Sequence, residues 1–218
     1  MCAMTHDSQP IADFFDRECC AAVDAGASAV PGSGGVTAML LDALTELGIR
    51  DMRVIELGSG AGALSRELVG RGAAHVTGFD LSPASVEHAT GVAAADGLAD
   101  HLDYRVGDAS LAQLEPVDVV VSQKVFCCYP RPDQLLANTL PAAGRLFALV
   151  LPESRGPVGL AARLIVGVES LLQRLRRDPF RAYVHDVRRV DASIRAAGFV
   201  RRVERRHWAW LVLAYSRS

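Results

Sequence analysis

The sequence predicts an α/β fold: a doubly wound, mostly parallel β-sheet with helices on both faces. From Arg53 onward, short β-type runs alternate with helical patterns, and repeated β–α units of this kind form parallel sheets. Val117–Ser122 is a continuous apolar run, as is typical of a strand buried on both faces. A turn with three glycines joins the first strand to the helix that follows it.

The composition is that of a single globular domain. The chain has 218 residues, of which 50% are hydrophobic and 22% charged, so we expect 1–218 to form one domain with a sizeable core. A formal net charge of -2 argues against general nucleic-acid binding. The 5 cysteines include no Cys-x-x-Cys, so neither a disulfide framework nor a metal site is expected. With no evident signal peptide or membrane-spanning segment, the sequence indicates a cytoplasmic protein.

The N-terminal part is predicted to be helical. Ile11–Cys20 has apolar residues at helical spacing, and Gly26–Gly35 is typical of a loop. A second helix is expected over Val36–Leu47, with Gly48 as its C-terminal cap. We interpret residues 1–47 as a helical lid segment.

The central part, 53–151, carries the alternating elements. A helix follows the glycine turn to about Val69, another begins with Ser82 as N-cap and Pro83 at its first position, and a third covers Asp133–Leu140. Five strands are predicted here, at Arg53–Leu57, His75–Asp80, Leu102–Val106, Val117–Ser122 and Gly144–Leu151.

The C-terminal part adds a long helix and two strands. The helix is predicted over Val158–Arg177 and ends at Asp178-Pro179; a shorter one lies within His185–Ala197. Phe199–Arg205 and Trp208–Tyr215 then form an antiparallel ending, which makes seven strands. An apolar stripe on the long helix is expected to be core or a seam between two copies, or else the roof of an apolar substrate: Leu160, Leu164, Val168, Leu171, Leu172 and Leu175.

The glycine turn is the first sign of a ligand site. Glu56 ends the first strand, and glycines follow at positions 58, 60 and 62. Glycine lacks Cβ, so the backbone can approach a ligand closely, and the next helix points its N–H groups at that ligand. In open parallel sheets, ligands bind beyond the carboxyl ends of the strands.

Three other strand ends carry polar residues. Asp80 ends the second strand, at the spacing at which an acidic residue accepts hydrogen bonds from ribose; on its own it could also cap the helix that starts at Ser82. Asp108 follows the third strand, and Ser122-Gln123 ends the fourth, facing the reaction centre. Ser122 and Gln123 are predicted to belong to the cofactor-binding set. The ordered set indicates a nucleoside ligand.

The spacing distinguishes between nucleoside ligands. Position 63 is alanine where the dinucleotide fingerprint requires its third glycine. Glu-x-Gly-x-Gly-x-Gly resembles the first motif of class I S-adenosylmethionine-dependent methyltransferases. Three further motifs of that family resemble residues 76–83, 106–109 and 117–121.

This resemblance implies a Rossmann-like fold, S-adenosylmethionine as cofactor and S-adenosylhomocysteine as product. The methionine part would be held by the turn (Glu56, Gly58, Ser59, Gly60, Gly62). Asp80 would bind the ribose hydroxyls, with Leu81 against adenine. Asp108 would bind the adenine amine, with Gly107 and Ala109 beside it.

A narrower resemblance concerns the flanks. Val125–Pro130, Phe180–His185 and Pro31–Thr37 look like a bacterial subgroup of small-molecule methyltransferases, distantly similar to magnesium-protoporphyrin O-methyltransferases. Ser122-Gln123-Lys124 departs from the Leu-Asp-Arg of these relatives, so a porphyrin substrate does not follow. The resemblance implies methyl transfer to a small molecule, with oxygen the favoured acceptor atom.

The predicted acceptor site lies between the flanks. Residues 157–185 are interpreted as an inserted helix and loop over it, and the substrate-binding candidates are Phe14, Phe15, Lys124, Phe126, Tyr129, Arg181 and Tyr183. His185 is a candidate general base and Tyr129 could orient the acceptor. A surface histidine, a packing aromatic and a solvated Lys124 are the alternatives.

Other functions stay open. The same cofactor could serve a reaction other than methylation, or a sensor or scaffold without turnover. Arginines concentrated after Leu160 leave RNA methylation as a third alternative, although nucleic acid is not the expected partner. A monomer and a homodimer are both compatible with the sequence.

Overall fold

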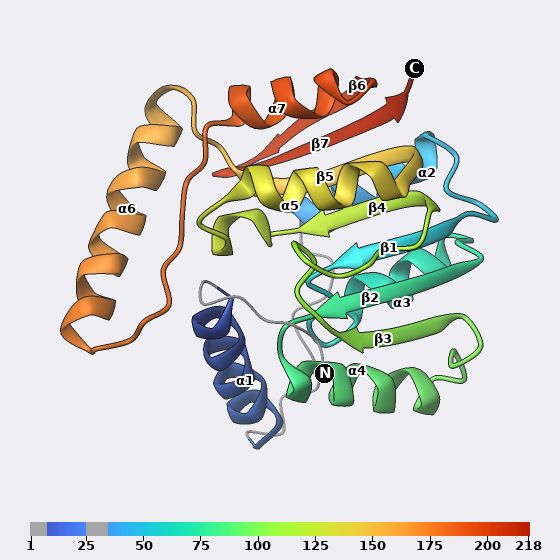
Figure 1. Ribbon diagram of the computed structural model, residues 1–218, viewed down its shortest axis with the longest axis horizontal. Coiled ribbons are helices and arrows are strands. Elements are labelled where there is room, and N and C mark those ends of the chain that lie inside the picture. Colours follow the sequence, from blue (N-terminus) through green and yellow to red (C-terminus); the bar gives the residue numbers. More distant parts are fainter. Residues whose placement is uncertain (1–7, 25–34) are drawn as a thin grey trace.

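The protein is built on one seven-stranded sheet (Figure 1). The computed structural model describes residues 8–24 and 35–218. The strand order is β3-β2-β1-β4-β5-β7-β6. β1 to β5 pair in parallel, whereas β7 is antiparallel to both of its neighbours. The predicted topology is confirmed. The strands are β1 (Arg53–Leu57), β2 (His75–Asp80), β3 (Leu102–Val106), β4 (Val117–Gln123), β5 (Ala143–Pro152), β6 (Phe199–His207) and β7 (Trp210–Arg217).

Helices cover both faces of the sheet. They are α1 (Gln9–Asp24), α2 (Val36–Glu46), α3 (Ala63–Gly70), α4 (Pro83–Ala95), α5 (Pro132–Thr139), α6 (Gly156–Leu175) and α7 (Val187–Ala196), with short 3-10 turns η1 (Phe126–Cys128) and η2 (Leu140–Ala142). One hydrophobic cluster joins α2, α3 and α4 to one face. A second joins α1, α5 and α7 to the other. Neighbouring strand residues alternate between the clusters, as Val119 and Val120 do, because successive side chains of a strand point to opposite faces.

Most predicted elements form within a few residues of where they are expected. α1 begins two residues before the predicted Ile11, and β7 begins at Trp210. Trp208 lies instead in the β6–β7 turn, with a φ of +53°, so the predicted start of the last strand was wrong. Of the predicted loop Gly26–Gly35, residues 26–34 lie outside the described residues, as do residues 31–34 of the Pro31–Thr37 resemblance.

The position of α6 contradicts one of the predictions for its apolar stripe. The stripe is exposed to solvent, so it is not core. Gly159 packs so closely on the backbone of Ser154 that an added Cβ would lie 2.1 Å from its carbonyl carbon. Only the side of the helix that carries Gly159 and Ala162 can approach the Ser154 backbone so closely. The large apolar residues lie on the other side and therefore face outward. In the described part of the chain, no helix combines the length and the apolar character needed to cross a membrane.

Candidate cofactor and acceptor site

The glycine turn between β1 and α3 needs its glycines for different reasons. Gly58, Gly60 and Gly62 all have positive φ, at +68°, +49° and +75°. An added Cβ on Gly58 would lie 2.3 Å from Val125, and one on Gly62 would lie 2.4 Å from the Tyr104 hydroxyl. A Cβ on Gly60 would meet no atom within 4 Å. Two glycines thus allow close packing of the turn, and the third leaves open space.

Asp80, at the end of β2, connects this turn to α4. Its Oδ2 accepts a hydrogen bond from the Gly60 N–H at 2.8 Å, and its Oδ1 accepts one from the Ser82 N–H at 2.9 Å. Ser82 is the N-cap of α4, so Asp80 supports the start of that helix as well as the turn. Burial raises the pKa of Asp80.

Glu56, at the end of β1, is buried beneath the turn. The Ser65 hydroxyl donates a hydrogen bond to its Oε2. Burial, with a smaller contribution from the nearby Asp80 charge, raises the pKa of Glu56 to about 8. At neutral pH this carboxyl group is therefore mainly protonated, and it does not line the cavity described next.

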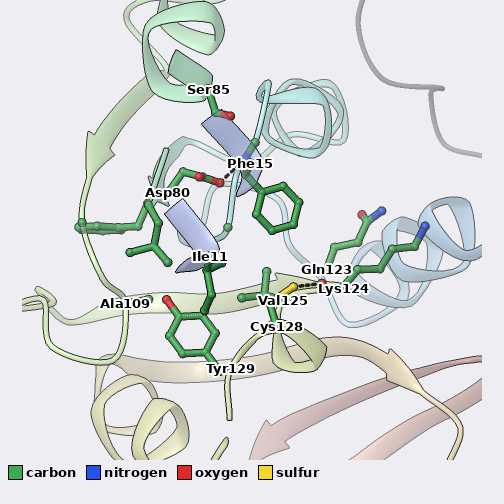
Figure 2. Close-up of a pocket in the computed structure, with 15 residues that line it drawn as sticks. Ile11, Phe15, Asp80, Ser85, Ala109, Gln123, Lys124, Val125, Cys128 and Tyr129 are labelled. Carbon is green, nitrogen blue, oxygen red and sulfur yellow. Dashed lines mark hydrogen bonds between the residues drawn. The ribbon is translucent and has the colours of Figure 1, made fainter. Parts of the chain in front are cut away.

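A cavity of about 200 Å³ lies at the carboxyl ends of β1 to β4 (Figure 2). Asp80 and Ser85 occupy one side of it and Gln123 and Lys124 the other, with Phe15 projecting between them. The lining includes ten predicted site residues: Gly58, Gly60, Asp80, Leu81, Gly107, Ala109 and Gln123 from the cofactor set, and Phe15, Lys124 and Tyr129 from the acceptor set.

The other predicted residues lie behind or beside this lining. Glu56, Ser59, Gly62, Asp108 and Ser122 do not line the cavity, and neither do Phe14, Phe126, Arg181, Tyr183 and His185. Five lining residues were absent from the predicted set, namely Ile11, Phe79, Ser85, Val125 and Cys128. Ile11 lies one helical turn before Phe15, so helical spacing could have identified it. The packing of Val125 on Gly58 left no signal in the sequence.

Unpaired polar atoms mark the same region. Four residues of the predicted cofactor set carry a buried oxygen without a hydrogen-bond partner in the described structure: Ser59, Asp108, Ser122 and Gln123. Leaving such a group unpaired in the interior costs about 1–3 kcal/mol. Together with the open space at Gly60, the free acceptors fit a nucleoside ligand that carries donor groups.

Asp108 and Tyr129 form one buried network. Oδ1 of Asp108 accepts hydrogen bonds from the Ser110 N–H at 2.9 Å, the Ser110 hydroxyl at 2.6 Å and the Tyr129 hydroxyl at 3.2 Å. Its Oδ2 is the free oxygen. Burial, reinforced by the Asp108 charge, raises the pKa of Tyr129 far above its usual range. The phenol therefore keeps its proton, and its O–H donates a hydrogen bond to Asp108.

α1 and the chain after α6 close one side of the site. The rings of Phe14 and Phe180 stack with centroids 4.2 Å apart, and Phe15 meets Phe180 edge-on at 5.8 Å. Arg17 pairs with Asp178 at 3.1 Å. These contacts hold two segments together that lie far apart in the sequence. The lid roles of residues 1–47 and 157–185 stay predictions.

Asp16 links α1 to the N-terminus of α4 by hydrogen bonds. Its Oδ1 accepts hydrogen bonds from the Ser82 hydroxyl at 2.5 Å and from the Ala84 N–H at 3.1 Å. A carboxylate at a helix N-terminus is favoured by the helix dipole. The contact keeps Ile11 and Phe15 against the cavity.

His185 lies beside η1, outside the cavity lining. Its Nε2 is 2.9 Å from the carbonyl oxygens of both Phe126 and Tyr129. Carbonyl oxygens only accept, so Nε2 carries the proton and donates it to them. Burial lowers the pKa of His185, which keeps the ring neutral. In the same segment, the Tyr183 N–H donates to the Cys127 carbonyl oxygen at 2.7 Å, and the Arg181 guanidinium donates to the carbonyl oxygens of Asp178 and Phe180.

Lys124 lies at the acceptor side of the cavity in an uncommon conformation. Its φ is +60°, in the left-handed region that is strained for any residue with a side chain. Such strain often occurs at functional sites. The Nζ atom lies 5.0 Å from the centroid of the Trp210 ring. The neighbouring Gln123 donates from Nε2 to Thr37 Oγ1 at 2.7 Å. The last residue of β4 and the first residue after it thus contact α2 and β7.

Comparison with known proteins identifies the domain. The profile of a family described as "Methyltransferase domain" matches residues 54–142. The ubiquinone biosynthesis O-methyltransferase of Neisseria meningitidis serogroup C is 32% identical over 131 residues, 57% of this chain and 53% of that protein. The ribosomal protein L11 methyltransferase of Escherichia coli O8 is 28% identical over 151 residues, 69% of this chain and 47% of that protein. The chain spans about half the length of the curated relatives it matches.

The fold extends over the whole chain in a solved structure. The crystal structure of magnesium protoporphyrin IX methyltransferase from Synechocystis PCC 6803 with bound SAH has a TM-score of 0.73 and 17% identity, covering 95% of this chain and 98% of that chain. Residues 54–142 thus match a methyltransferase domain, as predicted, and the magnesium-protoporphyrin enzyme has been crystallised with SAH and with SAM, in agreement with the predicted cofactor. The chain shares its fold with that enzyme, which confirms the narrower resemblance in fold.

Proposed function

We propose that this protein transfers the methyl group of S-adenosylmethionine to a carboxylate oxygen of a small, mainly apolar molecule. When bound, the cofactor supplies an activated methyl group on a sulfonium. The residues of this chain then need to align the acceptor with that group and exclude water, and such alignment can supply several kcal/mol of the barrier, about 7–11 in favourable cases.

One observation carries the choice of a small acceptor. α1 lies over the cavity through Ile11 and Phe15, and its contacts with Phe180 and Asp178 close the site from that side. A folded protein or RNA would require an acceptor side open to a large partner. Because one matched relative is named for a ribosomal protein, a protein acceptor is the alternative that the experiment has to test.

The cofactor-holding roles rest on two carboxylates at the strand ends and on one glycine of the turn. Asp80 would accept hydrogen bonds from the ribose hydroxyls, and the free Oδ2 of Asp108 would accept one from the adenine amine. Gly60 would allow the backbone to approach the methionine part, because no atom lies within 4 Å of its missing Cβ. The Tyr129 hydroxyl would orient Asp108.

The chemistry at the acceptor side favours a carboxylate. Lys124 places a positive charge there, which would attract and align an anionic acceptor group. A carboxylate is ionised at neutral pH and needs no general base. His185 is hydrogen-bonded to two backbone carbonyl oxygens, and the Tyr129 hydroxyl is hydrogen-bonded to Asp108. These partners support positioning roles for both residues in this reaction.

The test is incubation with methyl-labelled cofactor and a metabolite extract, followed by mild alkali. A methyl ester releases labelled methanol, whereas a phenol ether or an N-methyl product retains the label. Label in the acid-precipitated protein or RNA fraction would exclude a small acceptor. Cofactor consumption without methyl transfer would indicate another reaction, and unchanged bound cofactor a sensor. Asp80→Ala is the control for labelling that does not depend on this site.

A charge-removing variant tests the acceptor role separately. Lys124→Met keeps the length of the side chain and has the same left-handed backbone requirement. We expect the KM for the acceptor to rise about tenfold or more, the effect of losing one charge-assisted contact, with cofactor affinity unchanged. An unchanged KM would remove Lys124 from the acceptor site.

A further inference from the structure

α6 is an amphipathic helix that turns its apolar face away from the protein. Seven large apolar side chains on it are exposed, from 47% at Leu172 to 74% at Leu175. They fall at helical spacing on one side of the helix: Leu160, Leu164, Ile165, Val168, Leu171, Leu172 and Leu175. A contiguous exposed patch of this kind marks a surface that a partner covers.

The inward side of α6 cannot exchange with this face. Gly159 and Ala162 are its only buried residues, and Gly159 lies against the Ser154 backbone. Any rotation that buried the leucines would bring a side chain to the place of the Gly159 hydrogen. The outward direction of the apolar face is thus built into the packing at the start of the helix.

The charges next to this face are mainly positive. Arg163 and Arg174 lie on α6, and Arg176 and Arg177 follow it directly, while Glu169 is the single acidic residue over 156–177. All four arginine side chains are exposed, and within the described chain none of them has an ion pair or hydrogen bond. Long cationic side chains beside an apolar helix face can reach lipid phosphates while the apolar residues enter the acyl region.

A second copy of α6 packed antiparallel fits this charge pattern poorly. At 3.6 residues per turn, Arg163 and Arg174 lie along the same flank of the apolar face, and Glu169 lies on the other flank. Two such helices packed antiparallel about their centres would bring Arg163 of one copy beside Arg174 of the other. Like charges at that distance oppose the pairing, whereas an acidic lipid surface attracts both.

We propose that α6 lies on the surface of an anionic lipid membrane, with its leucine face in the acyl boundary and its arginines on the headgroup phosphates. This inference goes beyond the proposed function and does not depend on it. Charge complementarity decides between the possible occupants of the face. α6 would lie on the bilayer rather than span it, consistent with the absence of a spanning helix among the described residues.

The location of α6 gives the inference a consequence for the site. In Figure 1, α6 lies on the side of the molecule toward which the parallel strands point. The cavity lies at the carboxyl ends of the same strands. A chain docked through α6 would therefore turn the carboxyl ends of the parallel strands, where the cavity lies, toward the lipid. The amino ends of the strands would face away from it. An acceptor dissolved in the membrane would have a short path to it.

The experiment is vesicle flotation with the full chain. Vesicles of phosphatidylcholine mixed with phosphatidylglycerol should carry the protein upward, and vesicles of phosphatidylcholine alone should carry much less. Leu164→Glu with Val168→Glu should lower partitioning at least about tenfold, because two side chains of the apolar face become charged. Arg163→Glu with Arg174→Glu should lower it by about fivefold or more per arginine, and added salt should do the same for the wild type.

Two matched variants test whether the effect belongs to this face. Val200→Glu changes an exposed apolar residue on β6, and Arg188→Glu reverses an exposed charge on α7. Both should bind like the wild type. All altered residues are exposed, so every variant should keep the wild-type unfolding midpoint.

Three results would overturn the proposal. The wild type could fail to float with anionic vesicles, or the variant with Leu164 and Val168 changed could float as well as the wild type. Alternatively, the protein could sediment as a dimer that this variant dissociates, without binding vesicles, in which case a second copy covers the face. Because flotation requires no turnover, each of these results leaves the proposed methyl transfer untouched.

Discussion

Adding one methyl group at Gly60, by the substitution Gly60→Ala, should distinguish an effect on cofactor binding from an effect on folding. An added Cβ at this position would meet no protein atom within 4 Å, although Gly60 lines the cavity. The protein around it therefore tolerates the methyl group sterically. A bound cofactor would not, because the methyl group would occupy space at the surface where the ligand has to lie.

The magnitudes follow from the backbone angle. Gly60 has a φ of +49°, and a side chain in the left-handed region costs about 1–2 kcal/mol of folding free energy. Gly60→Ala should lower the free energy of unfolding by about that amount, as measured in urea. Loss of close approach at one contact should weaken S-adenosylmethionine binding about tenfold to a hundredfold, as measured by isothermal titration.

Gly48 provides the matched control. It follows Leu47, the C-cap of α2, with a φ of +84°, its added Cβ also meets nothing within 4 Å, and it does not line the cavity. Gly48→Ala should therefore lose a similar free energy of unfolding and bind the cofactor like the wild type. Equal affinity in both variants, or an equal loss in both, would refute the assignment of Gly60 to the cofactor surface.

Variants at three further positions test neighbouring parts of the site. Asp80→Ala should weaken cofactor binding about a hundredfold or more in titration calorimetry, since the proposed hydrogen bonds from the ribose hydroxyls to this carboxylate are lost, and Asp80→Asn should fall between it and the wild type. Glu56 should lower the free energy of unfolding by about 1.4 kcal/mol per pH unit from roughly pH 5 to pH 8, because the folded protein holds a proton on Glu56 (pKa about 8) that the unfolded chain has released; Glu56→Gln should remove this contribution and leave that of Asp80, whose pKa burial also raises. Asp16→Ala should speed amide hydrogen exchange in α1 and cofactor dissociation, because the contact of α1 with the start of α4 is lost, with a cost of about 1 kcal/mol.

Each of these expectations has a contradicting outcome. Asp80→Ala with unchanged affinity would remove the ribose role. A pH slope that Glu56→Gln leaves undiminished would assign the titration to another group. Exchange rates in α1 that are unaffected by Asp16→Ala would show that the phenylalanine contacts alone hold this helix.

The cofactor half of the site was largely predictable because it is built from local sequence. Gly58, Gly60 and Gly62 follow β1 within one turn, and Asp80 directly ends β2. Parallel strands bring their carboxyl ends to one edge, so residues at those ends meet without further information. The same reasoning located Asp108 and Gln123.

The acceptor half was predicted less completely because it depends on contacts between distant segments. Tyr129 and His185 were both candidates for chemistry at the acceptor. Tyr129 is instead hydrogen-bonded to Asp108, and His185 to backbone carbonyl oxygens. Neither partner can be read from local spacing, and the roles in catalysis stay predictions.

The sequence by itself determined the elements, the sheet and the cofactor class, because alternating apolar patterns, turn glycines and strand-end carboxylates act over a few neighbouring residues. Only the tertiary structure decided which way α6 faces. Its periodicity predicts an apolar side but not what that side meets, and the close contact of Gly159 with the Ser154 backbone turns it outward. The closure of the cavity by α1 was decided in the same way, through Asp16 and the phenylalanine contacts with residue 180. These contacts join residues far apart in the chain, where local patterns carry no information.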